Sequence, residues 1–85
     1  MTLAAEHIRA TLLDLIAQRG PDKTICPSEV ARALRANDWR SLMPAVREVG
    51  QALAEEGRVV VTQRGQIVDP QTARGPVRYG QPKKC

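Results

Sequence analysis

The sequence predicts an α+β fold of the winged-helix class, in which a three-helix helix-turn-helix core is joined by a short strand and a C-terminal two-stranded β-wing. Three observations lead to this prediction. Apolar residues recur at helical spacing in three segments before Gly57, a short β-branched stretch separates the first two segments, and two strand-like runs follow around a turn that contains glycine. The chain has 85 residues with one Trp, one Tyr and no Phe, so we expect one small domain with an aliphatic core.

The first helix is expected over residues 2–19, where Gly20 and Pro21 end it. Its apolar stripe has the spacing i, i+4, i+7 and i+8 and consists of Ile8, Leu12, Leu15 and Ile16. After a polar turn, the stretch TIC at residues 24–26 is too short for an independent strand. Its β-branched residues favour one short edge of a sheet.

Pro27 indicates the start of the second helix. With Cys26 as the N-cap, Pro27 takes the first helical position, where its missing N–H is harmless, and the Glu29 carboxylate can accept a hydrogen bond from the Cys26 N–H. The alternative N-cap, Ser28, makes no use of Pro27, so we prefer Cys26. The apolar face of this helix consists of Val30, Ala31 and Leu34.

The third helix is expected to start between Arg40 and Leu42, because Pro44 is tolerated only near a helix start, and to end at Gly57. Its apolar stripe, which completes one core with the other two helices, consists of Leu42, Val46, Val49 and Leu53. Trp39 precedes this helix. Packing across the corner between the second and third helices is the simpler interpretation of Trp39, and stacking on a base or a partner is the alternative.

Two strands are expected over residues 58–62 and 66–69, around a turn at residues 63–65, and they should pair with the short strand to close the open side of the core. The predicted winged-helix domain spans residues 1–70. Residues 71–85 lack periodicity and form a basic C-terminal tail, whose first part can dock in an extended form and whose end is expected to be mobile.

Charge is distributed unevenly along the chain. Through Gly57 there are 7 Lys/Arg and 8 Asp/Glu, a net charge of −1, whereas from Arg58 onward there are 6 Lys/Arg and 1 Asp, a net charge of +5. A basic excess in one third of the chain favours a polyanionic partner, nucleic acid before membrane, because no basic amphipathic helix accompanies it. A solubilising tail is the alternative interpretation.

Three stretches carry a resemblance to a known family. TICPSEVARAL, the block DWRSLMPAVREVGQALAEEGRVVVTQRGQIVDP and the later GPVR resemble the small bacterial family catalogued as domain of unknown function thirty-two fifty-three (DUF3253). The resemblance runs from about Ile8 to Arg78. It implies a winged-helix-like fold and supplies no catalytic residues, so the function has to be argued from the residues themselves.

The inventory of reactive residues disfavours an enzyme. The single histidine, His7, lies off the apolar stripe of the first helix with no cluster of ligands nearby, and Cys26 and Cys85 make neither a disulfide framework nor a zinc site. We expect no cofactor, no metal and no small-molecule ligand. Cys26 at a helix N-terminus admits a thiol-sensing role, but a small buried capping residue is the simpler interpretation.

The expected location is the cytoplasm. No apolar run approaches the roughly 20 residues of a membrane span, and the N-terminus lacks the pattern of a signal peptide. Two cysteines without a framework are typical of a reducing compartment.

Double-stranded DNA is the predicted partner. Arg40, Arg47 and Gln51 lie on the outward side of the third helix, seven and four residues apart, where a major groove can receive them. Glu48 and Glu55 interrupt the same surface and repel phosphates, so an ordinary solvated helix face stays open as the alternative.

The predicted wing provides the second contact. Arg64 lies beside Gly65 at the hairpin tip, from which a wing reaches phosphates or a minor groove. The basic residues expected to extend this surface are Arg58, Arg74 and Arg78, followed by Lys83 and Lys84. The sequence thus predicts a non-enzymatic winged-helix DNA-binding protein, such as a small transcriptional regulator. The alternative is a protein–protein interaction module on the same fold.

Overall fold

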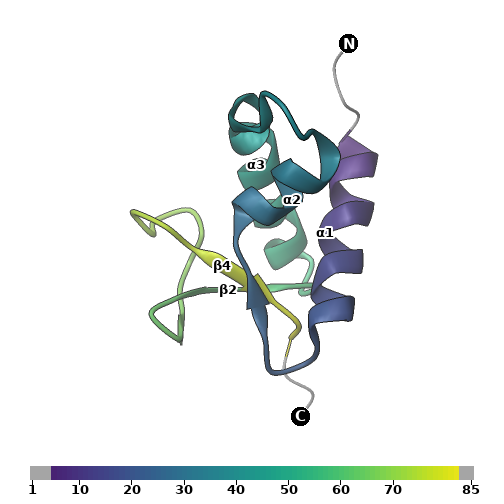
Figure 1. Ribbon diagram of the computed structural model, residues 1–85. Coiled ribbons are helices and arrows are strands. Elements are labelled where there is room, and N and C mark those ends of the chain that lie inside the picture. The colour runs from purple at the N-terminus through teal and green to yellow at the C-terminus, as the bar shows by residue number, and fades with distance from the viewer. Residues whose placement is uncertain (1–4, 83–85) are drawn as a thin grey trace.

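The structure, a computed structural model, describes residues 5–82 (Figure 1). It contains three α-helices, one 3₁₀ helix and four short strands in a single antiparallel sheet within that range. In chain order these elements are α1 (Ala5–Arg19), β1 (Thr24–Ile25), α2 (Pro27–Leu34), the 3₁₀ helix η1 (Trp39–Leu42), α3 (Met43–Glu55), β2 (Val60–Gln63), β3 (Gln66–Ile67) and β4 (Arg78–Gly80). The fold is therefore α+β, as predicted.

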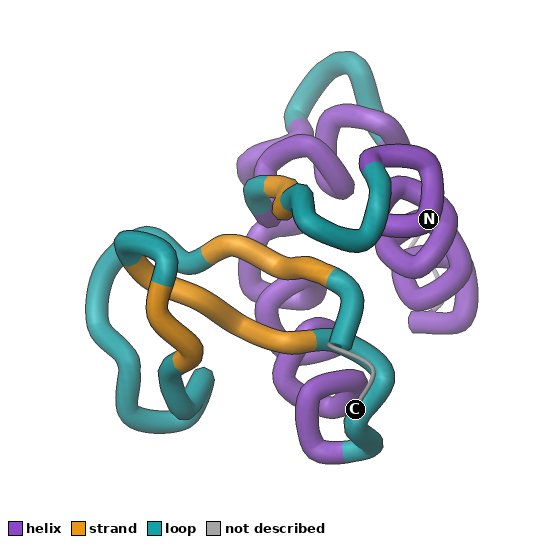
Figure 2. The backbone as a smooth tube through the Cα atoms, turned by 90° about the horizontal axis from the view of Figure 1, so that it is seen from below, coloured by secondary structure: helices purple, strands orange, loops and turns teal. Residues whose placement is uncertain are grey.

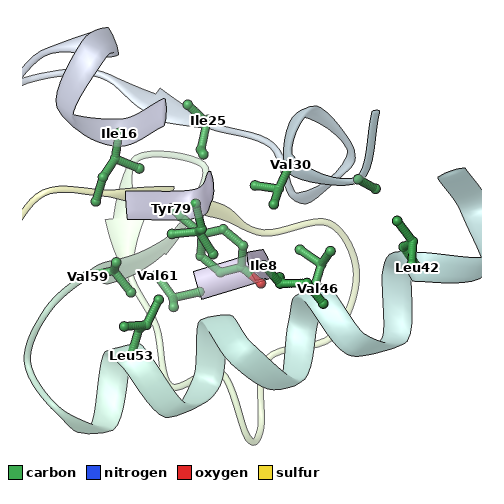
Figure 3. Close-up of a cluster of buried hydrophobic side chains, with 12 residues drawn as sticks. Ile8, Ile16, Ile25, Val30, Leu42, Val46, Leu53, Val59, Val61 and Tyr79 are labelled. Carbon is green, nitrogen blue, oxygen red and sulfur yellow. The ribbon is translucent and has the colours of Figure 1, made fainter. Parts of the chain in front are cut away.

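The helices follow the predicted stripes closely. The start expected for the first helix, residues 2–4, lies outside the described residues, and α1 ends at Arg19 as expected. The core consists of Ile8, Leu12, Ile16, Ile25, Val30, Ala31, Leu42, Val46, Leu53, Val59, Val61 and Tyr79 (Figure 3). Three residues expected in this core, Leu15, Leu34 and Val49, pack against it but are only partly buried.

The predicted start of α2 is confirmed. Cys26 is the N-cap and Pro27 the first helical residue, and the Cys26 N–H donates to the Glu29 carboxylate at 2.7 Å. This contact satisfies one backbone donor that the helix itself leaves without a partner. Cys26 is only partly buried, so the expectation of a buried side chain is wrong.

The start of α3 is split into two helical pieces. The 3₁₀ helix η1 covers the expected start, and α3 proper begins at Met43, which leaves Pro44 in the first turn, where it is tolerated. After α3 ends, Gly57 adopts φ +76°, and the Arg58 N–H donates to the Leu53 carbonyl at 2.9 Å. This left-handed cap confirms Gly57 as the stop of the helix.

The sheet has the strand order β1-β4-β2-β3, which differs from the expected pairing. We expected the short strand to pair with the hairpin, but β1 pairs with β4, and β4 pairs with β2. The inward-facing row is Ile25, Tyr79 and Val61, which are direct cross-strand neighbours and all buried. The expectation failed because β4 has only three residues and too few apolar positions to show a period of two.

The hairpin turn is shorter than predicted. Gln63 pairs with Gln66, so the turn has only two residues, Arg64 and Gly65, with φ +51° and φ +81°. Two consecutive positive φ angles are the signature of a type I′ turn, which matches the twist of the flanking strands. The strands are also shorter than expected, because β2 begins at Val60 and β3 ends at Ile67.

Tyr79 links the C-terminal third to the helices. Its side chain is 1% exposed and packs on α3 at Gly50, where an added Cβ would lie 2.5 Å from the Tyr79 ring (Figure 3). Beyond Pro70, where we had placed the start of a tail whose first part can dock, the chain supplies β4 to the sheet. The expected mobile end with Lys83 and Lys84 lies outside the described residues.

The connection between β2 and β4, residues 64–77, is named the arm here. It contains the type I′ turn, β3 and a longer irregular stretch. Its far end projects away from the helices (Figures 1 and 2), while Gln71 within it donates a hydrogen bond to Glu55 of α3. The Gln63 side-chain amide donates to the backbone carbonyls of Arg74 and Pro76, at 2.5 and 3.1 Å. These two bonds hold the returning part of the arm against the hairpin.

Candidate nucleic-acid interface

Two grooves border the returning part of the arm, residues 73–77. One groove, of about 490 Å³, lies between α3 and this segment, and Ala73, Gly75 and Val77 line it. The other, of about 520 Å³, lies between the segment and the hairpin, and Arg74 and Pro76 line it. Successive residues of the segment thus line opposite grooves, although Gly75, with φ +88°, bends the chain between them. The helix α3, the segment and the hairpin therefore lie side by side.

The α3 groove brings together two predicted contact residues. Arg47 and Gln51 line it beside Glu48, and Tyr79 lines it from the sheet side. Burial raises the pKa of Tyr79, and the nearby Arg47 cation opposes this effect only in part. The phenol is therefore a neutral hydroxyl at physiological pH.

Two acidic residues at the end of α3, Glu55 and its C-cap Glu56, form contacts within the fold. Glu55 accepts hydrogen bonds from the side-chain amides of Gln51 and Gln71, at 3.5 and 3.1 Å. Glu56 forms a two-point ion pair with Arg9, with both N···O distances at 2.7 Å. The hydrogen bonds and charge of Arg9 lower the pKa of Glu56. Glu48 is exposed at the edge of the α3 groove and is the acidic residue next to the predicted contacts.

The hairpin groove brings together the other pair of predicted contacts, Arg64 and Arg74. Arg64 is at the tip of the type I′ turn, and both side chains are exposed. Neither guanidinium forms a hydrogen bond or an ion pair with another residue in the range 5–82. Gln63, which we had expected in the turn, fixes the register that sends Arg74 toward the hairpin. The sequence did contain a signal for this position. A two-residue hairpin turn at Arg64 and Gly65, a common turn length, would have placed Gln63 in the strand.

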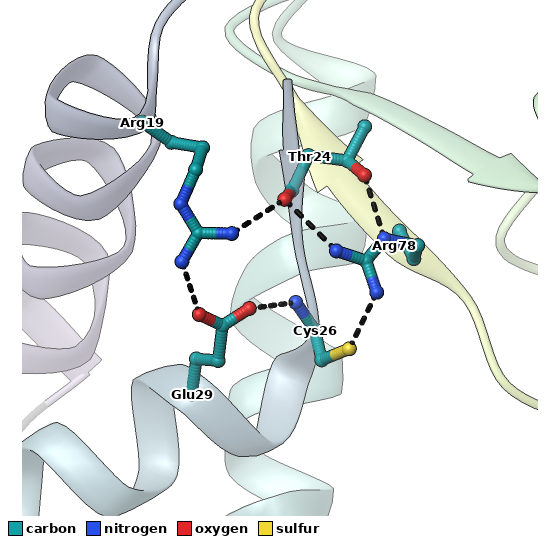
Figure 4. Close-up of polar contacts among 5 residues, drawn as sticks. All are labelled: Arg19, Thr24, Cys26, Glu29 and Arg78. Carbon is teal, nitrogen blue, oxygen red and sulfur yellow. Dashed lines mark hydrogen bonds and ion pairs between the residues drawn. The ribbon is translucent and has the colours of Figure 1, made fainter.

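Three predicted contact residues lie elsewhere. Arg40 is on η1, with its guanidinium carbon 4.4 Å from the centroid of the Trp39 ring. Arg58 follows the end of α3, where its charge helps to lower the pKa of Glu56. Arg78 is on β4 and points toward β1 (Figure 4). The structure thus gathers Arg47, Gln51, Arg64 and Arg74 along the arm and separates the remaining three from them.

Arg78 belongs to a cluster of five polar residues, Arg19, Thr24, Cys26, Glu29 and Arg78, named the Arg78 cluster (Figure 4). Its guanidinium donates to the Thr24 hydroxyl at 2.6 Å, to the Thr24 carbonyl at 3.0 Å and to the Cys26 sulfur at 2.8 Å. Arg19 also donates to the Thr24 carbonyl, at 3.1 Å, and forms an ion pair with Glu29. These contacts tie α1, β1, α2 and β4 together.

The Arg78 cluster also sets the ionisation of Glu29. Burial opposes the charged form and is the largest single effect, but the hydrogen bonds from the Cys26 N–H and Arg19, with the charges of Arg19 and Arg78, outweigh it. The pKa of Glu29 is therefore lowered.

The described residues also bear on other classes of site. His7 is exposed on α1. Across residues 5–82, no three His, Cys, Asp or Glu side chains are arranged so that they could hold a metal ion. None of the helices in this range combines the length and apolar character that crossing a bilayer requires.

The fold class, three helices with a four-stranded antiparallel sheet, is shared by many unrelated proteins and by itself assigns no activity. Residues 5–82 match the family described as "Protein of unknown function (DUF3253)", and the chain belongs to this family. The family resemblance noted in the sequence is thereby confirmed. No curated protein matches the chain.

Proposed function

We propose that this protein is a non-enzymatic winged-helix protein that binds double-stranded DNA, with α3 as the element that enters a groove and the arm as the wing. The observation that carries the proposal is the side-by-side arrangement of α3, residues 73–77 and the hairpin, with Arg47 and Gln51 along one groove and Arg64 and Arg74 along the other. We place the protein in the bacterial cytoplasm, where a small transcriptional regulator would act.

The strand order supports the winged-helix interpretation. The strands β1, β4 and β2 form an antiparallel sheet against the helices, and their inward row is part of the core. The long β2–β4 connection then projects beyond this sheet, in the position that a wing requires (Figure 2). Because β3 pairs only with β2, it extends the wing and adds nothing to the core.

The chemistry of the four side chains suits a duplex. Arginine presents a planar fork of N–H donors that matches phosphate oxygens or a guanine edge, and a glutamine amide pairs with adenine. Arg64 and Arg74 have no partner among the described residues that would compete with a phosphate. Arg78 donates three hydrogen bonds within the fold, so we assign the phosphate contacts of the wing to Arg64 and Arg74 rather than to Arg78.

The test is binding of a fluorescently labelled random-sequence duplex, followed by anisotropy between 50 and 200 mM salt, about the range in which phosphate contacts are lost. Arg64→Ala and Arg74→Ala should each weaken binding to all sequences and reduce the steepness of log affinity against log salt by about 0.9. Arg47→Ala should instead weaken binding to some sequences more than to others, because a base contact carries sequence information.

Arg9→Gln is the matched control. It removes one positive charge, as the arm variants do, but from a guanidinium already paired with Glu56. A salt slope that falls equally for Arg9→Gln and Arg64→Ala would reduce the effect to net charge and contradict the assignment to the arm. Failure of the wild-type protein to retain duplex DNA at 50 mM salt would reject the proposed function.

A protein–protein interaction module is the second candidate, and one observation favours it. Ile67 is 67% exposed on the outward face of the sheet, where it borders a hollow lined also by Val60 and Thr62. A single exposed apolar residue on a sheet face is a weak sign of a docking surface. If duplex DNA is not retained, this face becomes the first place to test, with Ile67→Asp as the variant.

A further inference from the structure

Trp39 is enclosed by two arginines at the corner between α2 and α3. The guanidinium carbons of Arg32, on α2, and Arg40, on η1, each lie 4.4 Å from the centroid of the Trp39 ring. Trp39 itself is partly buried and packs against the core. The ring therefore packs on the core and at the same time carries two cations. Packing was the interpretation that we preferred for Trp39, and the two arginine contacts were not predicted.

Contact with a ring leaves donors of a guanidinium available. The group has five N–H donors that radiate in its own plane, and a ring covers only those that are turned toward it. Neither Arg32 nor Arg40 forms an ion pair within residues 5–82. Asp38, which directly precedes Trp39 in the sequence, accepts a hydrogen bond from the Ser41 hydroxyl at 3.0 Å. Two planar donor edges are thus held in place without an acidic partner.

We propose that Arg32 and Arg40, stacked on Trp39, form a second phosphate-binding site, which takes phosphodiester groups of a DNA backbone. This inference rests on the proposed function. Because η1 leads directly into α3, a duplex that receives α3 in its major groove brings its backbone to this corner. Phosphodiesters fit the site better than carboxylates do, because two neighbouring anions of one strand can engage two fixed guanidinium groups. The site lies at the N-terminal end of α3, whereas Arg58 follows its C-terminal end, so the site would fix the position of α3 in the groove from its N-terminal end.

Trp39 is the only tryptophan of the chain, so its fluorescence reports on this site alone. Wild-type protein should be titrated with an unlabelled random-sequence duplex while Trp39 emission is recorded. We expect the emission to change along the same curve as the anisotropy of the labelled duplex. Inorganic phosphate, at equal phosphate concentration and constant ionic strength, should produce less than a tenth of that change. An equal change with inorganic phosphate would overturn the assignment to a DNA backbone.

Substitutions separate a phosphate contact from a purely structural role. Arg32→Gln and Arg40→Gln should each weaken duplex binding about tenfold and lower the salt slope by about 0.9. Arg32→Lys and Arg40→Lys keep the charge without the planar fork, so they should retain the slope and lose only part of the affinity. Arg9→Gln again serves as the control. Thermal unfolding of each variant identifies the folded ones, and the Lys variants preserve the test if a Gln variant unfolds.

The outcomes distinguish this inference from the proposed function. If Arg64→Ala lowers the slope while the Arg32 and Arg40 variants bind like wild type, the second site is wrong and the DNA-binding function stands. If the Gln variants lose thermal stability but keep the salt slope, the arginines only hold Trp39 in place, and the inference is also wrong. If the wild-type protein binds no duplex, the proposed function and this inference both fail.

Discussion

Arg78 and Arg64 come from the same basic third of the chain, but their surroundings differ completely. The exposed Arg78 guanidinium is shared between Thr24 and Cys26 and joins β4 to β1, whereas Arg64 is at the tip of the arm without a partner among the described residues. The net charge of +5 that we counted from Arg58 onward thus combines a residue that joins elements with residues that face solvent. A count of charges along the sequence therefore predicts a binding surface only when the cations that form contacts within the fold, such as Arg78, are left out.

The two regions are also held by different means. At the Arg78 cluster, the strand β1 has only two residues. Besides its backbone pairing with β4, it accepts hydrogen bonds from the side chains of Arg19 on α1 and Arg78 on β4. The arm is held by the β2–β3 pairing, by the bond from Gln71 to Glu55 and, in its returning part, by the Gln63 amide and its bonds to two backbone carbonyls. Substitutions in the first region should therefore change stability, and substitutions in the second should change binding. The expected outcomes below test this contrast, from the largest effect to the smallest.

Removal of residues 71–85 should have the largest effect. A chain that ends at Pro70 loses β4 and the Tyr79 ring, and truncating one buried aromatic residue alone costs about 3–5 kcal/mol. Since a small domain has only about 5–15 kcal/mol of stability in total, we expect the shortened chain to be largely unfolded by circular dichroism. A chain that ends at Pro82 keeps every element of the structure and should unfold cooperatively. A cooperative transition of similar midpoint in both chains would contradict the central place of β4.

Gly50→Ala should reduce stability by about 1–3 kcal/mol, although alanine is the better helix former, because the new methyl group would overlap the Tyr79 ring. The measurement is the free energy of unfolding in urea. In a Tyr79→Leu background the ring is absent, so the same Gly50→Ala change should be neutral or stabilising. Equal costs in both backgrounds would mean that the glycine serves some purpose other than the close approach of Tyr79.

The sequence predicted the helices well and the sheet poorly, for a physical reason. Stripes such as Val46 to Leu53 repeat over several turns, and the cap at Cys26, Pro27 and Glu29 has a local chemical signature. Strand β4 has three residues, and its importance comes from two distant partners, β1 and β2. Tyr79 could not be predicted as a core residue, because it packs on Gly50, which is 29 positions away in the sequence. A glycine has no side chain that would indicate such a contact.

The candidate site was predicted in the same uneven way. Residues on one regular element, such as Arg47 and Gln51, could be grouped by helical spacing alone. Arg74 and Arg64 line the same groove because of the path that an irregular segment takes. Arg78 forms hydrogen bonds with β1 because β4 lies next to β1 in the sheet. Neither of these long-range arrangements leaves a periodic signal in the sequence.

Arg78→Gln and Arg64→Gln should separate stability from binding. Arg78→Gln removes hydrogen bonds that an exposed guanidinium donates to Thr24 and Cys26, so we expect a loss of about 0.5–1.5 kcal/mol in the free energy of unfolding. Arg64→Gln changes an exposed side chain and should stay within about 0.5 kcal/mol of wild type. Arg78→Lys should not restore stability, since one ammonium group cannot reach all three acceptors at once. Wild-type stability in Arg78→Gln would contradict the structural role of the cluster.

The smallest expected effect is the pH dependence that Glu29 confers. Its pKa is lowered in the folded protein, because the Cys26 N–H and the Arg19 and Arg78 cations together outweigh the opposing effect of burial. A carboxyl group with a lowered pKa stabilises the fold above its unfolded-state pKa, near about 4.3, and this contribution disappears as the pH falls through the folded-state pKa. Glu29→Gln keeps the shape of the side chain but cannot ionise.

The wild-type protein should therefore be more stable than Glu29→Gln at pH 7, by about 1 kcal/mol, the usual net value of a hydrogen bond. The difference should shrink below about pH 4 as the wild-type carboxyl group takes up its proton. Urea unfolding of both proteins from pH 7 to pH 3 measures this difference directly. Other carboxylates with lowered pKa values, such as Glu56, are present in both proteins and cancel. A difference that is absent at pH 7, or one that stays constant down to pH 3, would contradict a contribution of the Glu29 charge to the link between β1 and α2.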